Sequence, residues 1–479
     1  MTDAQMLQPD LKKRFLLKAG IGATALQPLL SFQLQAAAAQ VVDPVWAGAE
    51  QILQDLKRTS FPDRDFVITT FGAKKNQRCD QALAAAIEAC HQAGGGRVVV
   101  PEGLWSTGPV HLKSNVNLHL QKNAVLSFVT EPKAYLPLVF TRWEGVELMG
   151  FSPLVYAYKQ QNIAITGEGI LEGNASGDNW WPWKGVWKHT PWQLDPATDQ
   201  KAGREQLFAM AEAGVPVEQR ILDNNRLRPP FIQPYACERV LIEGVTIRNS
   251  PFWLINPVLC KDVVIRAVNC VSHGPNSDGC DPESCQRVLI ENCLFDTGDD
   301  CIALKSGRNA DGRRLATPVQ QVLIQDCLMK SGHGGVVIGS EISGGAKQIF
   351  ARRCRMSSPD LERGLRIKTN SVRGGLIEQV AVDDIEIGEV KDAIVINFYY
   401  EEGDAGQFLP QVKDLSISNF RVRKAQRAFE IRGLPRAGIS GISMTDVSFE
   451  QASLGVLDNA SDFKLSNVKL NGKTWTGPS

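Results

Sequence analysis

Three short motifs in the middle of the chain combine carboxylates with an imidazole. They are Asn276-Ser277-Asp278, Gly298-Asp299-Asp300 and Gly332-His333-Gly334. Carboxylates gathered on one patch repel one another, so at least one should keep its proton at a pH where the others are ionised. A proton donor beside ionised carboxylates is the arrangement that hydrolysis of a glycosidic bond requires.

A fourth motif, Leu365-Arg366-Ile367-Lys368, alternates apolar and basic residues. Side chains alternate between the two faces of a β-strand, so a strand that buries the leucine and isoleucine presents Arg366 and Lys368 together on its outer face. Two neighbouring cations suit a substrate that carries carboxylates.

The elements that must position these motifs repeat along the chain. Ten segments with alternating apolar residues end at Ile165, Ile242, Ile265, Ile290, Ile324, Ala351, Val382, Ile417, Met444 and Leu465. Each unit is too small to bury its own apolar face, so the units must stack as coils whose strands pair about 4.8 Å apart. The pattern predicts an all-β fold, a single-stranded right-handed parallel β-helix.

This repeat brings the motifs into register. Asp299 and His333 each lie nine residues after the last residue of their own segment. Equal offsets in a solenoid stack above one another, which predicts that these two residues lie one coil apart, with Asp278 one coil before Asp299 and Asp300. Each motif alone would more often be a turn, a loop or a solvated strand face. Their joint register on four consecutive coils predicts a site.

The four motifs, in this order, resemble those of the polygalacturonase family of glycoside hydrolases over roughly residues 60–470. The resemblance implies a right-handed β-helix and inverting hydrolysis of α-1,4-galacturonosyl links in polygalacturonate and pectin. It implies that Asp299 is the general acid and that Asp278 and Asp300 activate water. His333 would hold the protonation state of the acid.

The resemblance also implies which residues bind substrate. Arg366 and Lys368 would bind a galacturonate carboxylate, and Asn276 would position the neighbouring aspartate or hydrogen-bond a sugar. The family has a tyrosine after the basic motif, and Tyr399 or Tyr400, about thirty residues further along, could fill this place.

Other functions on the same fold stay open at this point. A rhamnogalacturonan hydrolase is the nearest alternative, although the two cations favour a galacturonate next to the cleaved bond. A pectate lyase would use calcium, and a non-catalytic β-helix would only bind polysaccharide. Asp278-Gly279-Cys280-Asp281 could ligate calcium but lacks the spacing of a calcium-binding loop, so neither a metal nor a cofactor is expected.

The start of the chain differs from the repeat region. Basic residues precede a mildly apolar stretch, and Ala36-Ala37-Ala38-Ala39 supplies small residues suited to signal cleavage. The segment Lys13-Arg14-Phe15-Leu16-Leu17 resembles a twin-arginine export signal with lysine in the first arginine position. We therefore expect residues 1–39 to be an export segment, residues 40–479 to be the β-helix domain, and the protein to be periplasmic or secreted.

Two regions interrupt or flank the repeat. Residues 79–93 are predicted to form a helix that caps the first coil, because an open solenoid end would expose its core. An insertion at about 174–235 contains five tryptophans within thirteen residues and a predicted helix near 201–213. These tryptophans predict either a stacking surface for sugar rings or a small aromatic core. The insertion could also close one end of the cleft and restrict the enzyme to chain ends.

Composition narrows the partners. The 52 basic and 52 acidic residues balance, which argues against nucleic acid, and 43% hydrophobic residues argue against disorder. The interrupted apolar stretch near the start would make a poor membrane span. The expected partner is acidic plant cell-wall polysaccharide, bound by a monomer. Among the eleven cysteines, Cys293, Cys327 and Cys354 are predicted to stack as buried thiols, and Cys280 with Cys285 is the pair expected to oxidise.

Overall fold

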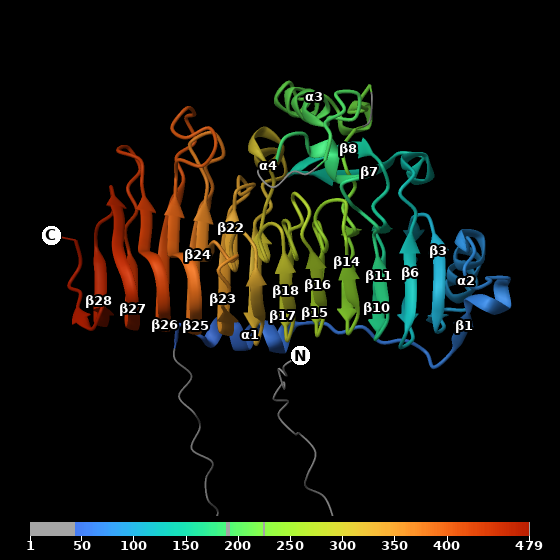
Figure 1. Cartoon of the computed structure of the whole chain (residues 1–479), viewed down its shortest axis with the longest axis horizontal. Helices are drawn as coiled ribbons and strands as arrows, with labels where there is room; N and C mark the ends of the chain where they lie inside the picture. Colours follow the sequence, from blue (N-terminus) through green and yellow to red (C-terminus); the bar gives the residue numbers. More distant parts are fainter. Residues whose placement is uncertain (1–43, 188–191, 224–225, 479) are drawn as a thin grey trace, which may run out of the picture. The chain divides into compact units, whose positions relative to one another are not determined.

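The computed structural model describes residues 44–187, 192–223 and 226–478. The predicted export segment lies outside these residues. Residues 44–478 fall within one compact unit, a right-handed parallel β-helix whose coils succeed one another along a single axis (Figure 1). None of the described helices combines the length and the apolar character that a membrane span needs.

Three rows of parallel strands form the coil. The first row runs from end to end and consists of β1 (Asp65–Val67), β2 (Gly96–Val100), β5 (Val116–Leu120), β10 (Gln161–Gly167), β13 (Glu238–Glu243), β15 (Lys261–Arg266), β17 (Gln286–Glu291), β20 (Val319–Gln325), β23 (Ala346–Met356), β25 (Leu376–Asn397), β26 (Gln411–Arg432), β27 (Ile442–Asp458) and β28 (Phe463–Leu470). The short β29 (Lys473–Thr474) pairs antiparallel with β28.

The other two rows are made of shorter strands. The second row contains β3 (Gly103–Thr107), β6 (Ala124–Phe128), β11 (Ile170–Glu172), β14 (Thr246–Arg248), β16 (Asn269–Ser272), β18 (Leu294–Thr297) and β21 (Leu328–Ser331). The third row contains β4 (Val110–His111), β9 (Val155–Tyr158), β12 (Ile232–Tyr235), β19 (Ile302–Leu304), β22 (Val336–Gly339) and β24 (Arg363–Lys368). In the C-terminal coils, β25 and its successors bend and continue through all three rows.

The predicted register is confirmed along the whole repeat. Each residue that was predicted to end a segment pairs with the next one, from Ile165 with Ile242 to Met444 with Leu465. Val98 and Leu118 occupy the same position in two earlier coils.

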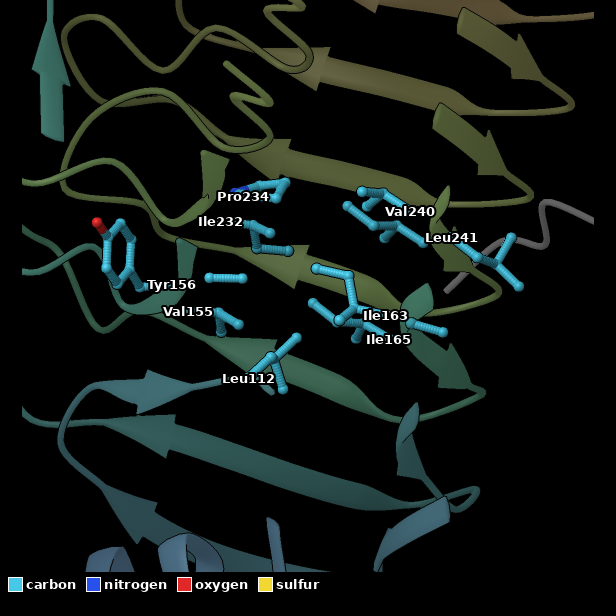
Figure 2. A pocket seen from close by; sticks show the side chains of 12 residues that line it. Leu112, Val155, Tyr156, Ile163, Ile165, Ile232, Pro234, Val240 and Leu241 are labelled. Carbon is cyan, nitrogen blue, oxygen red and sulfur yellow. The ribbon is translucent and has the colours of Figure 1, made fainter. Parts of the chain in front are cut away.

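Apolar side chains fill the space between the rows. Figure 2 shows this for three coils, where Val155, Ile163 and Val240 point into the interior while Tyr156 and Leu241 point away from it. Side chains at equivalent positions of successive coils stack on one another, so every coil extends one continuous core.

All eleven cysteines are buried free thiols, including the predicted stack of Cys293, Cys327 and Cys354. The expected disulfide between Cys280 and Cys285 is wrong. Cys280 belongs to a strand-like bridge of the third row, Cys285 directly precedes β17, and both thiols are buried. The Cys285 thiol donates a hydrogen bond to the carbonyl of Pro257 at 3.2 Å, in a second thiol stack.

Helices close the coil at one end and cover it on the outside. The predicted capping helix is confirmed as α2 (Asp80–Gln92), which buries Leu83 and Ile87 against the first coil (Figure 1). Helix α1 (Ala47–Asp55) was not predicted. It packs Ile52 on the outer face of the first row. Short 3₁₀ helices are η1 (Ile68–Phe71), η2 (Pro132–Tyr135), η3 (Trp181–Lys184) and η4 (Val217–Gln219).

The insertion interrupts the coil between β11 and β12. Its predicted helix is confirmed as α3 (Lys201–Glu212), and α3 packs beside α4 (Asn309–Leu315) and an antiparallel hairpin of β7 (Val139–Trp143) and β8 (Val146–Gly150). The hairpin escaped sequence analysis because its turn is Glu144-Gly145. Both turn residues have positive φ. Asn-Gly or Asp-Gly at these positions would have predicted such a turn, whereas Glu-Gly does not.

Candidate active site

The predicted site residues come from loops and strands of four consecutive coils. Asp278 follows β16, Asp299 and Asp300 lie between β18 and β19, and His333 lies between β21 and β22. The two predicted cations lie in β24. Because neighbouring coils pair in parallel, loops that leave the second row at the same point meet on one side of the coil.

Asp299 and His333 form a hydrogen-bonded pair, as their equal offsets predict. The Nδ1 of His333 lies 2.8 Å from Asp299 Oδ1. The same oxygen accepts the backbone N–H of Asp300 at 2.9 Å. The hydroxyl of Thr297 donates to the Asp299 carbonyl at 2.9 Å and fixes the turn. The side chain of Asp299 is 16% exposed, so the cleft can reach it.

The glycines beside His333 make room for this pair. A Cβ on Gly332 would lie 2.4 Å from the carbonyl oxygen of Asp299. A Cβ on Gly334 would lie 2.5 Å from a methyl of Val337 and 3.2 Å from Asp300 Oδ1. The glycines therefore let the imidazole loop approach the aspartate loop closely.

Asp300 is fully buried between the two predicted cations. Arg366 Nη1 donates to one carboxylate oxygen at 3.2 Å, and Lys368 Nζ donates to the other at 2.6 Å. Burial alone would raise the pKa of Asp300, but the charges of Lys368 and Arg366 outweigh it and lower this pKa. Asp300 is therefore ionised.

Asp278 lies in a different electrostatic environment. Its carboxylate oxygen Oδ2 is 3.8 Å from Lys305 Nζ, and its Oδ1 is buried without a hydrogen-bond partner among the described residues. Burial, reinforced by the neighbouring Asp281 charge, raises the pKa of Asp278 well above its ordinary value. Sequence reasoning missed Lys305, although the strand pairing places it at the same register as Lys368, two coils earlier.

The prediction that one carboxyl keeps its proton matches the environment of Asp278. Asp299 behaves differently: burial would raise its pKa, but the charge of His333 and their hydrogen bond lower it. In turn the Asp299 charge raises the pKa of His333, despite opposing burial. The Asp299–His333 pair therefore holds its shared proton on the imidazole when no substrate is bound.

The two candidate tyrosines separate clearly. The ring of Tyr400 lies 5.6 Å from the Arg366 guanidinium carbon and 5.2 Å from Lys368 Nζ, measured to the ring centroid. The side chain of Tyr399 is directed to solvent and 41% exposed. The structure therefore brings Tyr400, and not Tyr399, to the cations of the site.

The side chain of Asn276 contacts the insertion and not Asp278. Its Oδ1 accepts a hydrogen bond from Arg228 Nη2 at 2.7 Å. Arg228 is fully buried and also donates to the carbonyls of Pro251 and Pro275 at 2.9 and 2.8 Å. Sequence reasoning missed Arg228, because only the fold brings residue 228 of the insertion to the loop after β16.

A cleft of about 590 Å³ opens beside His333. Three tryptophans of the insertion line one wall, Trp181, Trp187 and Trp192. Trp180 and Trp183 are instead buried in the core below. The two predictions for the tryptophan cluster therefore apply to different residues. The three in the cleft could form a stacking surface for sugar rings, and the other two belong to an aromatic core.

The three aspartates offer oxygens that lie within 4.8 Å of one another, a spacing that could hold a cation. Basic side chains contact these aspartates: His333 binds Asp299, Arg366 and Lys368 bind Asp300, and Lys305 lies near Asp278. These four side chains already supply positive charge, so a metal ion would compete with them.

Comparisons with known proteins identify the family of the chain. The family model "Glycosyl hydrolases family 28" matches residues 217–474, more than half of the chain. A solved exopolygalacturonase from Thermotoga maritima is 42% identical, with a TM-score of 0.84, covering 89% of this chain and 96% of that one. An exo-poly-alpha-D-galacturonosidase from Dickeya chrysanthemi is 25% identical over 85% of this chain and 68% of its own length.

A family 28 exopolygalacturonase from Yersinia enterocolitica shares the fold, with 21% identity and a TM-score of 0.69, covering 87% of this chain and 77% of that one. The chain belongs to family 28 of the glycosyl hydrolases.

Proposed function

We propose that this protein is a polygalacturonase that cleaves α-1,4-galacturonosyl linkages of polygalacturonate and pectin and acts from chain ends. The observation that carries the proposal is the hydrogen-bonded Asp299–His333 pair next to a buried carboxylate held by two cations. The names and identities of the relatives support the same substrate class.

Asp299 is the residue that delivers a proton to the leaving oxygen. In the free protein the shared proton rests on His333, and it crosses the 2.8 Å hydrogen bond to Asp299 as negative charge develops on the leaving oxygen. Asp299 then donates it, and the glycosidic bond breaks. Attacking water loses a proton to Asp300, the carboxylate that Lys368 and Arg366 keep ionised, so His333 gives up one proton and Asp300 takes up one in the reaction.

Arg366, Lys368 and Tyr400 bind the galacturonate next to the cleaved bond. A planar guanidinium and an ammonium beside one another suit a sugar carboxylate. Both cations already hold Asp300, so a substrate carboxylate would join an ordered charge cluster without having to organise it.

Exo action is supported by the insertion, which adds α3 and the tryptophan wall beside the catalytic loops, and by the description of the Thermotoga maritima relative. The test is product sizing on polygalacturonate. Release of one product size from the first minutes supports the proposal, whereas mixed oligomers with a fast loss of viscosity would show internal cleavage. An ultraviolet-absorbing unsaturated product would instead identify a lyase.

Inversion at the anomeric carbon is part of the proposal. The aspartate oxygens approach within 4.8 Å, nearer to the ~5–5.5 Å typical of retaining enzymes than to the ~6.5–9.5 Å typical of inverting ones. We nevertheless propose inversion, because the family resemblance implies that Asp278 activates water and does not act as a nucleophile. Proton NMR of the first-formed product decides, because the initial anomer reports the stereochemistry directly.

Export of the protein follows from a polymeric substrate that lies outside cells. The alanine-rich stretch before residue 40 is the proposed cleavage region. Mass spectrometry of the protein recovered from periplasm or medium should give a mature chain that begins near residue 40. Recovery of the full-length chain from the cytoplasm alone would contradict export.

A further inference from the structure

The cleft beside His333 has a rigid aromatic wall. The indole N–H of Trp181 donates to the carbonyl of Ser250 at 3.0 Å. The ring lies so close to Gly274 that a Cβ there would come within 2.2 Å of the indole nitrogen. The indole is therefore fixed against the backbone of the coil.

Two further indoles extend this wall. Trp187 and Trp192 stack on each other with ring centroids 5.8 Å apart and an angle of 7° between the planes. Flat aromatic rings offer a large apolar area with little conformational freedom to lose. Such a surface suits the C–H face of a pyranose ring.

The charges of this cleft differ from those beside Asp300. None of the described residues that line it is a lysine or an arginine, whereas Asp360 and Glu362 both line it. Glu362 forms an ion pair with Arg363, and the side chain of Asp360 is exposed at the wall. The imidazole of His273, also in the lining, is 3.3 Å from Asp296.

A galacturonate with a free carboxylate fits this cleft poorly. Its charge would lie beside the exposed carboxylate of Asp360, with no lysine or arginine in the described lining to bind it. Glu362 and Asp296 are paired with Arg363 and Lys330, and the His333 imidazole is paired with Asp299, so the substrate carboxylate has no available cation among the described residues there. A galacturonate whose carboxylate carries a methyl ester has no such charge and adds an apolar methyl group. It keeps the pyranose face that the indoles can cover.

We propose that the cleft lined by Trp181, Trp187 and Trp192 is a subsite for a methyl-esterified galacturonosyl unit. This proposal rests on the proposed action on pectin. It specifies which galacturonosyl unit the enzyme accepts on this side of the Asp299–His333 pair. The enzyme thus combines one position that requires a free carboxylate, at Arg366 and Lys368, with one that disfavours it.

The first experiment changes the charge of the wall. Initial rates are measured on polygalacturonate and on a partly methyl-esterified preparation of the same polymer. Asp360→Lys should lower the ratio of kcat/KM for the esterified to the free polymer about tenfold, because the new cation favours a free carboxylate. The matched control is Asp63→Lys, which makes the same charge change on an exposed aspartate of the first coil and should leave the ratio unaltered.

The second experiment removes part of the aromatic wall. Trp192→Ala should lower kcat/KM on the esterified polymer about tenfold, with most of the change in KM. The control is Trp46→Ala, which removes an indole that lies at the start of α1 and packs against Phe350 outside the cleft, and it should change neither constant. Far-UV circular dichroism and thermal unfolding show that each variant is folded.

The outcomes separate the subsite from the proposed function. If the unchanged protein cleaves neither polymer, the proposed function is wrong. If the protein cleaves both polymers, either of two results would support the proposed function and overturn the methyl-ester subsite. Asp360→Lys would leave the ratio of kcat/KM unchanged, or Trp192→Ala would lower kcat/KM equally on free and esterified polymer.

Discussion

The two sides of the Asp299–His333 pair are built from different parts of the chain. On one side, Arg366 and Lys368 lie in β24, a strand whose register is fixed by pairing with β22 and β25. On the other side, the tryptophan wall belongs to an insertion that interrupts the coil. The strand side is buried and ion-paired, and the insertion side is an open cleft lined by tryptophans together with Asp360 and Glu362.

This difference indicates a division of tasks. Groups whose charge must be placed within a fraction of an ångström come from the coil, because strand pairing fixes their position at every rung. Groups proposed to choose among related substrates come from the insertion and from the loop that holds Asp360, where residues can change without shifting the register of the core. The following changes test that division.

The largest effect is expected from Asp299→Asn, which removes the proposed proton donor that lies between the β24 cations and the tryptophan wall. The amide cannot deliver a proton, so kcat should fall roughly 10³-fold on polygalacturonate while the far-UV spectrum and the unfolding temperature stay the same. Asp326→Asn, an exposed surface aspartate, serves as the control. If Asp278→Asn abolishes activity and Asp299→Asn does not, the donor is Asp278, the carboxyl whose pKa burial raises.

Lys368→Met should weaken the strand side by about a hundredfold in kcat/KM, because it leaves Asp300 buried with one cation and removes a carboxylate ligand. The pKa of Asp300, lowered by Lys368 and Arg366 against its burial, should rise in this variant. Asp300 would then take up a proton at higher pH, so the acid limb of kcat/KM should move to higher pH. Lys391→Met, at an exposed position of β25, should move neither quantity.

The paired tyrosines offer a matched test with a smaller effect. Tyr400→Ala should raise KM for polygalacturonate about tenfold, since the ring contacts both cations. Tyr399→Ala removes an exposed ring one residue away and should change KM less than about twofold. Equal effects of the two substitutions would contradict the placement of Tyr400 in the site.

The smallest effect is expected from Glu362→Gln, in the wall of the open cleft. The pKa of His333 is raised chiefly by Asp299 and in smaller part by Asp300 and Glu362. Removing the Glu362 charge should lower this pKa. His333 would then lose its proton at lower pH, so the alkaline limb of kcat/KM should shift to lower pH by a fraction of a unit. An alkaline limb that stays in place would show that His333 does not set it.

Sequence analysis predicted the coil, the strand register and most of the polar cluster, because each depends on a spacing that recurs from one segment to the next. Ten apolar segments gave the strand positions, and nine-residue offsets placed Asp299 beside His333. It did not separate Tyr399 from Tyr400, because neighbouring residues beyond a strand end have no period that fixes their direction. It also paired Cys280 with Cys285, since spacing does not tell a loop from a bridged third row.

The sequence by itself determined which residues recur at one point of each coil, because strand periodicity and stacking are local properties that every unit repeats. Only the tertiary structure decided how these residues share charge and protons. The fold brings Lys305 near Asp278 and Arg228 of the insertion to Asn276. Burial raises the pKa of Asp278, while the two cations of β24 lower that of Asp300. Burial and charge pairing depend on neighbours that are distant in sequence, so no motif could assign them.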